Sequence, residues 1–185
     1  MKSKNELRKI ITAQCLNFDS LYYENAAKLL LQMAKPLLLS ANKIAIYHAN
    51  INEIKLDFLI DFAIKQGKKL FQPISYYNSK IMRFNGYDKN NSKIFYSNNY
   101  ELKDEIQWYN LDLIFLPLIA IDKLGHRIGK GGGYYDTTLS GILEKKVRPI
   151  LCGVGFDCQL VNKIPNDEWD IPLDYFLSEK QLIKF

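Results

Sequence analysis

Residues 116–139, LPLIAIDKLGHRIGKGGGYYDTTL, join an apolar segment, a tight turn and a glycine-rich loop. Residues 122–125 have the composition of a turn, and we expect a helix to begin near Tyr134. Four glycines lie between them: Gly129, Gly131, Gly132 and Gly133. Glycine lets backbone amides approach an anion closely and permits positive φ, and amides at a helix start favour phosphate. With the cations Arg127 and Lys130 beside them, these glycines predict a phosphate-binding loop.

The loop matches neither familiar nucleotide-binding pattern. In a P-loop the lysine is followed by Ser or Thr, whereas Lys130 is followed by Gly131, and the G-x-G-x-x-G spacing is absent. A flexible turn without a ligand therefore remains the alternative interpretation of the glycines.

The segments on either side of this loop predict parallel strands. DLIFL (112–116) and PILCGV (149–154) are continuous apolar runs, typical of strands buried on both faces. KIAIY (43–47) predicts another strand, followed by a helix over about 56–66 that Gly67 closes and a strand over 68–72. A strand, a helix and a strand in this order form a βαβ unit with parallel strands.

Two further helices are predicted near the N-terminus. Apolar residues recur helically over 5–16, with Ser3 or Asn5 available as the cap, and again from Asp19 or Ser20 to about Lys35, where Pro36 is expected to end the helix. A β-rich excursion includes residues 81–84, and the polar stretch 85–99 predicts a loop. The whole pattern predicts an α/β protein, a three-layer α/β/α sandwich with a mostly parallel, Rossmann-like sheet.

Length and composition predict one domain, residues 1–185, because 48% hydrophobic residues in 185 are enough for one core. No apolar run approaches the roughly 18 residues of a membrane span, and MKSKNELRKII does not resemble a signal peptide, so we expect a cytoplasmic protein that does not bind membranes. The net charge of +5 comes from lysines spread along the chain, which argues against nucleic-acid binding. Cys15, Cys152 and Cys158 are expected to be reduced core residues, and a monomer is the default.

Several charged residues have two interpretations from the residues alone. Asp136, in the first turn after the loop, either caps the helix or holds magnesium, and the cap is favoured. Asp170 is a second metal-side carboxylate or a solvated loop acid. Lys4 and Arg8 share one helix face, and the default interpretation is that this face is exposed to solvent. Glu53 and His48 follow the strand 43–47, where such sheets gather binding residues, and His48 is equally well explained as a satisfied polar residue at a strand end.

The run FLPLIAIDKLGHRIGKGGGYYDTTL resembles the D-x-x-G-x-R-[LI]-G-x-G-x-G-Y-Y-D signature of the 5-formyltetrahydrofolate cyclo-ligase family. KNELR is similar to that family's N-terminal K-x-x-L-R, AIYHANINEIKLD resembles its Glu-containing loop, and GFDCQLVNKIPNDEWDIPLDYFLSE resembles its tail. The resemblance covers both ends and the middle of the chain, and it implies the fold shared by NagB, RpiA and CoA-transferases. It also implies ATP- and Mg²⁺-dependent conversion of 5-formyltetrahydrofolate to 5,10-methenyltetrahydrofolate, with phosphorylation of the formyl oxygen.

The resemblance also implies residue roles. It assigns ATP to Lys4, Arg8, Arg127, Gly129, Gly131, Gly132, Gly133, Tyr134 and Tyr135. It assigns the folate to His48, Glu53, Lys130, Gly131, Gly132, Gly133 and Tyr134, and magnesium to Asp136 and Asp170. The catalytic groups it implies are Arg127, Lys130 and Tyr135. Two other classes remain open: a sugar-phosphate isomerase or CoA-transferase relative, which would not need ATP, and an RNA-binding module.

Overall fold

The computed structural model describes residues 2–76, 78–88 and 104–185. Its helices are α1 (Lys4–Cys15), α2 (Ser20–Ser40), α3 (Asp57–Lys65) and α4 (Tyr134–Thr138), with 3-10 turns η2 (Trp108–Asn110), η3 (Ile142–Glu144) and η4 (Asp157–Gln159). The large sheet contains β1 (Lys43–Ala45), β2 (Lys69–Ile74), β3 (Arg83–Gly86), β4 (Leu113–Pro117), β7 (Ile150–Val154), β9 (Tyr175–Leu177) and β10 (Leu182–Lys184). The small sheet contains β5 (Ala120–Asp122), β6 (Arg127–Ile128) and β8 (Leu160–Val161).

The large sheet is mostly parallel, as the sequence predicts. Its order is β10-β9-β7-β4-β1-β2-β3, and the pairings from β9 through β7, β4 and β1 to β2 are all parallel. The edge strands β3 and β10 pair antiparallel. The predicted βαβ unit is present, because α3 connects β1 to β2 and Ile44 pairs with Leu70 in parallel register.

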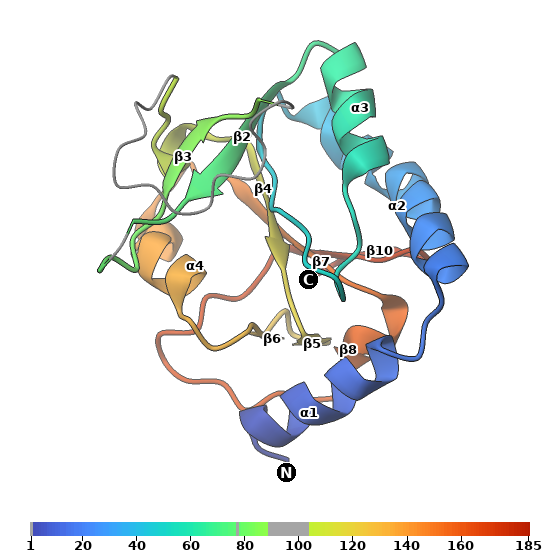
Figure 1. Cartoon of the computed structure of the whole chain (residues 1–185). Helices are drawn as coiled ribbons and strands as arrows, with labels where there is room; N and C mark the ends of the chain where they lie inside the picture. Colours follow the sequence, from blue (N-terminus) through green and yellow to red (C-terminus); the bar gives the residue numbers. More distant parts are fainter. Residues whose placement is uncertain (1, 77, 89–103) are drawn as a thin grey trace.

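Strand β4 shows why the sheet is covered on both faces. Leu113 and Phe115 point into one hydrophobic cluster, while Ile114 and Leu116 point into the other, and all four are fully buried. Successive side chains of a strand alternate between faces, so an unbroken apolar run needs a layer on each side. Figure 1 shows α2 and α3 together on one side of the sheet and α4 on the other.

Helix α1 begins with a capping box, which fixes the residue at which the helix starts and therefore the direction of its charged side chains. Ser3 Oγ accepts from the Glu6 amide at 3.2 Å, and Glu6 Oε2 accepts from the Ser3 amide at 2.7 Å. The helix buries Leu7, Ile11 and Cys15, a stripe of residues four apart. Figure 1 shows α1 lying along the small sheet.

The predicted end of α2 at Lys35 is wrong, because the helix continues through Pro36 to Ser40. Proline removes one backbone donor from the helix interior, normally a cost of about 3 kcal/mol. Pro36 is exposed, so water can satisfy the carbonyl that this proline leaves without a donor. The following turn buries Leu37 and Leu38, and this burial offsets the lost hydrogen bond.

Three smaller expectations are corrected. The strand expected over 43–47 is shorter, although the Ile46 amide still donates to Phe71 O at 2.9 Å. Cys15 and Cys152 are buried as expected, but Cys158 is exposed. The polar stretch 85–99 begins inside β3, and residues 89–99 lie outside the described ranges. In those ranges no helix is both long and apolar enough to span a membrane.

Candidate active site

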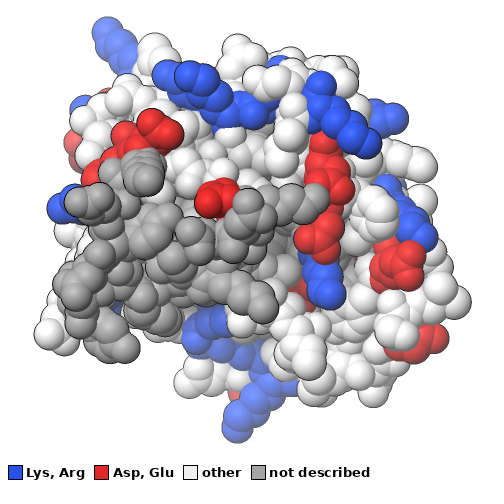
Figure 2. Space-filling view, turned by 45° about the horizontal axis from the view of Figure 1, so that its top comes forward, with Lys and Arg blue, Asp and Glu red and all other residues white. Residues whose placement is uncertain are grey.

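A pocket of about 600 Å³ opens at the carboxyl ends of β1, β2 and β4. Residues just after these strands line it, including His48, Ser75 and Leu118. The glycine-rich loop, the start of α4 and the N-terminal part of α1 complete its wall. Ligands of open α/β sheets bind at this edge of the sheet, because the strand ends and the loops after them converge there. On the face drawn in Figure 2, acidic side chains lie beside basic ones.

The glycine-rich loop emerges from a rigid β-hairpin. Strands β5 and β6 pair antiparallel around the predicted turn, in which the Gly125 amide donates to Asp122 O at 3.1 Å. Asp122 is fully buried, and its carboxylate accepts from the amides of Leu124, His126 and Ile164 at 2.9–3.0 Å. The hairpin is therefore fixed by one buried carboxylate, and the hairpin in turn holds the glycine-rich loop at the pocket.

The loop requires glycine for two different reasons. Gly131 and Gly133 have φ of 95° and 71°, in the left-handed region that side chains disfavour. A Cβ on Gly132 would lie 2.8 Å from the Tyr134 ring. Helix α4 has five residues, so its dipole is weaker than the sequence argument assumed, and the loop amides and neighbouring cations are the groups that face an anion there.

Lys4 and Arg8 contact the pocket, which overturns the default interpretation of a solvated helix face. Lys4 Nζ lies 2.7 Å from Asp167 and 2.5 Å from Asp170, and Arg8 Nε donates to Gly129 O at 2.8 Å. Partial burial disfavours the charged form of Lys4, but the two aspartates outweigh it and raise the pKa of Lys4. The N-terminal helix is thus tied to both the glycine loop and the 167–170 segment.

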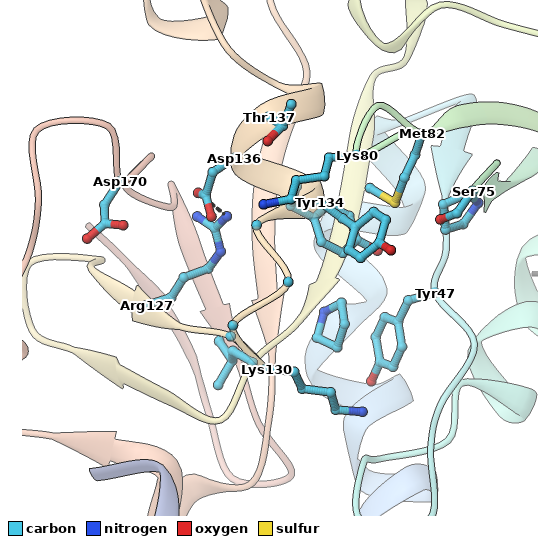
Figure 3. A pocket seen from close by; sticks show the side chains of 18 of the residues that line it. Tyr47, Ser75, Lys80, Met82, Arg127, Lys130, Tyr134, Asp136, Thr137 and Asp170 are labelled. Carbon is cyan, nitrogen blue, oxygen red and sulfur yellow. Dashed lines mark hydrogen bonds and ion pairs between the residues drawn. The ribbon is translucent and has the colours of Figure 1, made fainter. Parts of the chain in front are cut away.

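Asp136 is not a helix cap, which corrects the interpretation favoured from the residues alone. Gly133 is the N-cap of α4 and no side chain caps that helix. Asp136 Oδ1 instead lies 2.6 Å from Arg127 Nη2, a contact that Figure 3 shows as a dashed line. Arg127 also donates to Ile171 O, and its side chain is 6% exposed, so this guanidinium is held in a fixed position.

Asp136 and Asp170 lie with Arg127 on one side of the pocket (Figure 3). Each carboxylate has one oxygen, Asp136 Oδ2 and Asp170 Oδ1, that makes no hydrogen bond within the described part of the chain. The described residues contain no cluster of three or more metal-ligating side chains. Mg²⁺ is commonly held by one or two carboxylates together with water and substrate phosphates, so two carboxylates with free oxygens fit that ion.

Glu53 and His48 also line the pocket. The Glu53 carboxylate pairs with Lys130 Nζ at 2.7 Å and accepts from the Asn50 amide at 2.9 Å. His48 Nε2 lies 2.9 Å from Gln72 Oε1, and burial lowers the pKa of His48 despite this bond. His48 is therefore both a hydrogen-bonded residue at a strand end and a neutral group in the pocket wall.

The two tyrosines differ in their surroundings. Tyr135 packs against the core cluster on the α4 side of the sheet as well as lining the pocket. Burial, with the Glu53 charge adding to it, raises the pKa of Tyr135, although Arg127 opposes the shift. The Tyr135 hydroxyl therefore stays protonated at neutral pH and can donate a hydrogen bond. Tyr134 contributes its ring to the pocket wall (Figure 3).

Sequence reasoning missed several pocket residues. Trp169 and Lys80 are exposed in the pocket wall, and Asp167 shares Lys4 with Asp170. A tryptophan directly before the predicted carboxylate Asp170 is the sequence signal that could have identified Trp169. Lys80 comes from a segment without a motif, so only the fold brings it to the site.

Comparisons with known proteins agree with this architecture. A model of the 5-formyltetrahydrofolate cyclo-ligase family matches residues 1–179. A 5-formyltetrahydrofolate cyclo-ligase from Haemophilus influenzae is 30% identical over 178 residues, 92% of each chain, and one from Escherichia coli K12 is 31% identical over 147 residues, 76% of this chain and 80% of that one. The solved structure of Aquifex aeolicus 5,10-methenyltetrahydrofolate synthetase superposes with a TM-score of 0.79 at 25% identity, covering 98% of this chain and 92% of that chain. A 5,10-methenyltetrahydrofolate synthetase from Mycoplasma pneumoniae shares the fold, with a TM-score of 0.76 at 20% identity over 96% of this chain and 99% of that one.

A mostly parallel sheet with a pocket lined by cations and a glycine-rich loop at its carboxyl edge is typical of α/β enzymes. The family match covers nearly the whole chain and includes every pocket residue described above. The chain belongs to the 5-formyltetrahydrofolate cyclo-ligase family.

Proposed function

We propose that this protein uses ATP to convert 5-formyltetrahydrofolate to 5,10-methenyltetrahydrofolate, releasing ADP and phosphate. The γ-phosphoryl group passes to the formyl oxygen, the neighbouring nitrogen attacks the activated formyl carbon, and phosphate leaves. Phosphorylation is needed because an amide-like oxygen is a poor leaving group. One observation carries this proposal: a single pocket joins the glycine-rich loop and its cations to the Glu53 carboxylate.

At the phosphate end, cations from distant parts of the chain converge. Lys4 and Arg8 from α1 lie with Arg127 from β6, and the loop amides of Gly129, Gly131, Gly132 and Gly133 lie beside them. Lys4 is paired with Asp167 and Asp170, and Arg127 with Asp136, while Arg8 binds the carbonyl of Gly129. Phosphate oxygens can take over the same donors, so the site is preformed and spends little energy on rearrangement.

Asp136 and Asp170 would hold Mg²⁺ through their unbonded oxygens. When bound, this ion supplies charge neutralisation at the transferred phosphoryl group. Arg127 keeps Asp136 oriented and Lys4 keeps Asp170 oriented, so both carboxylates face the pocket before any ligand binds.

At the other end, Glu53 is placed to accept hydrogen bonds from the amino-pyrimidine donors of the folate. Neutral His48 and the rings of Tyr47 and Tyr134 form the surrounding wall, where flat ligands pack against aromatic faces. We assign Lys130 the role of stabilising the charge that develops between the two substrates, since Lys130 lies on the glycine-rich loop and its side chain reaches Glu53. Tyr135 acts as a hydrogen-bond donor and Arg127 as a phosphate clamp.

We also propose that residues 1–185 act as one domain and as a monomer. Both core clusters pack on the same sheet, which supports one domain. The free cysteines suit a reducing compartment, which supports a cytoplasmic location.

The test is a spectrophotometric assay of the purified protein with 5-formyltetrahydrofolate and Mg²⁺, with and without ATP. We expect the near-ultraviolet absorbance of the methenyl product only when ATP is present. Product without ATP would contradict the phosphorylation step. No product despite ATP binding would show that the phosphate loop is correct and the acceptor is wrong.

A further inference from the structure

The end of α1 and the turn η4 bring two free thiols face to face outside the pocket. Cys15 Sγ lies 4.0 Å from Cys158 Sγ, although the two residues are 143 positions apart. Cys15 is 2% exposed, Cys158 is exposed, and neither is in a disulfide. The third cysteine, Cys152, is fully buried in β7.

Hydrogen bonds between side chains and backbone groups hold each of these two cysteines in place. The Tyr23 hydroxyl donates to Cys15 O at 3.1 Å. Turn η4 is anchored by Gln159, whose Nε2 donates to Leu118 O and Ile119 O at 3.0 and 2.9 Å. The Asp157 amide donates to Glu179 Oε2 at 3.0 Å. The approach of the two sulfurs is therefore fixed by the packing of α1 against η4.

The two thiols are not equivalent. Hydrogen bonding with Cys15 lowers the pKa of the Cys158 thiol, although burial and the Glu179 and Asp157 carboxylates oppose this. The same bond, together with burial, raises the pKa of the Cys15 thiol. Cys158 is thus the more acidic and the more accessible sulfur, which are the properties of a thiol that reacts first.

We propose that Cys15 and Cys158 form a redox-modification site that a peroxide converts to a reversible disulfide. Cys158 sulfur attacks one peroxide oxygen, the O–O bond breaks, and Cys158 sulfenic acid and water form. Cys15 sulfur then attacks the Cys158 sulfur, the S–O bond breaks, and the second oxygen leaves as water with the Cys15 proton. Two thiols lose two electrons and hydrogen peroxide gains them, and an added thiol reverses the change.

The disulfide would fasten the C-terminal end of α1 to the body of the protein. The sulfurs need to approach by only about 2 Å to reach bonding distance. Lys4 and Arg8 lie on the same helix, so the bond retains the helix that carries two of the proposed ATP contacts. Closing so long a loop restricts the unfolded chain, and we expect the melting temperature to rise by about 5–10 °C.

The experiment treats the reduced full-length protein with hydrogen peroxide and maps its peptides without reduction. We expect a Cys15–Cys158 cross-linked peptide, an intact mass lower by two hydrogens, one remaining titratable thiol and a higher melting temperature. Dithiothreitol should reverse all four changes. Cys158→Ser replaces an exposed side chain, so it should fold but lose the cross-link and the temperature shift, whereas the control Cys152→Ala should keep both.

Three outcomes would overturn the proposal. They are recovery of Cys15 and Cys158 in separate unmodified peptides, oxidation of Cys158 to sulfinic acid without a cross-link, and a dimer linked through Cys158. A cross-linked monomer whose melting temperature does not rise would overturn the stabilising role. None of these readouts depends on catalytic activity, so they stand apart from the assay of the proposed function.

Discussion

Lys130 Nζ lies 2.7 Å from Glu53 Oε1, and this ion pair joins the glycine-rich loop to the segment after β1. The Glu53 side chain is only 10% exposed, whereas that of Lys130 is 54% exposed. A second donor, the Asn50 amide, binds Glu53 Oε2 at 2.9 Å. The carboxylate is therefore oriented before a ligand binds, and in the proposed complex the folate would share these donors or replace Lys130.

Replacing Glu53 by Gln should raise KM for 5-formyltetrahydrofolate by roughly 10- to 100-fold, because a charged hydrogen bond contributes about 1.5–3 kcal/mol. The affinity for ATP should change little. Steady-state kinetics with each substrate varied separately measures both. Glu144→Gln, at an exposed position in η3, is the matched control, and an equal loss for both substrates would show that Glu53 supports the whole pocket rather than the folate.

Lys4→Met should weaken ATP binding by roughly 10-fold or more while leaving the KM for folate near its native value, because a bound phosphate loses a cation. Lys9→Met alters an exposed lysine of the same helix and serves as the control. Binding can be followed by tryptophan fluorescence in a Trp108→Phe background, since Trp169, the other tryptophan, is exposed in the pocket. Equal effects of Lys4→Met and Lys9→Met would show that Lys4 acts only through the overall charge of the protein and not through a contact with phosphate.

Asp136→Asn should lower kcat by about 100-fold or more and shift the Mg²⁺ dependence to higher concentration, because a neutral amide is a poor ligand for this ion. Its oxygen can still accept from Arg127, so the free energy of unfolding should fall by only about 1 kcal/mol. Kinetics with a magnesium titration and thermal melting measure the two effects. Unfolding of the variant at room temperature would mean that the Asp136–Arg127 pair is chiefly structural.

The same measurements on Asp170→Asn should show a similar loss. Glu168→Gln, an exposed acid two residues away, is its control and should retain native kinetics.

Gly132→Ala should reduce kcat/KM for ATP by roughly 10- to 100-fold, because its Cβ would lie 2.8 Å from the Tyr134 ring and would push this ring or the loop aside. Gly129→Ala is the comparison, since nothing lies within 4 Å of an added Cβ there, and its loss should be smaller. The melting temperatures of both variants should stay close to native. A larger loss for Gly129→Ala would contradict the steric explanation.

His48 should make the protein less stable in mild acid. Burial lowers the pKa of His48 in the folded state below its ordinary value of 6.5. As pH falls through that value, the unfolded chain gains a proton that the folded chain does not, so the free energy of unfolding falls until pH reaches the folded pKa. Between pH 8 and about pH 5, the melting temperature should fall less steeply with pH for His48→Gln than for the native chain. Parallel slopes would show that His48 titrates alike in both states.

Much of the fold could be predicted because it depends on local patterns. The apolar runs at 112–116 and 149–154 predict parallel strands buried on both faces, and β4 and β7 are such strands. The glycine loop and the helix beginning at Tyr134 also follow from nearby residues. These features rest on side-chain alternation and on glycine's freedom at positive φ, which act within a few residues.

Where the sequence argument was wrong, a distant contact outweighed a local preference. A proline generally ends a helix, yet α2 continues beyond Pro36 because the next turn buries Leu37 and Leu38. Asp136 has the position of a capping residue, yet Arg127, nine residues earlier in the chain, binds its carboxylate. In both cases the competing interaction exists only after the sheet and its covering helices have formed.

The sequence alone determined the central parallel strands, the glycine-rich loop and the motifs of the cyclo-ligase family, because each is written in contiguous residues. Only the tertiary structure decided that Lys4 meets Asp170 across 166 positions, that Arg8 binds the carbonyl of Gly129, and that Cys15 faces Cys158. Such contacts depend on where the packed core places α1 against the hairpin and η4. No local preference encodes that placement, since it follows from burying Leu7 and Ile11 together with the rest of the core.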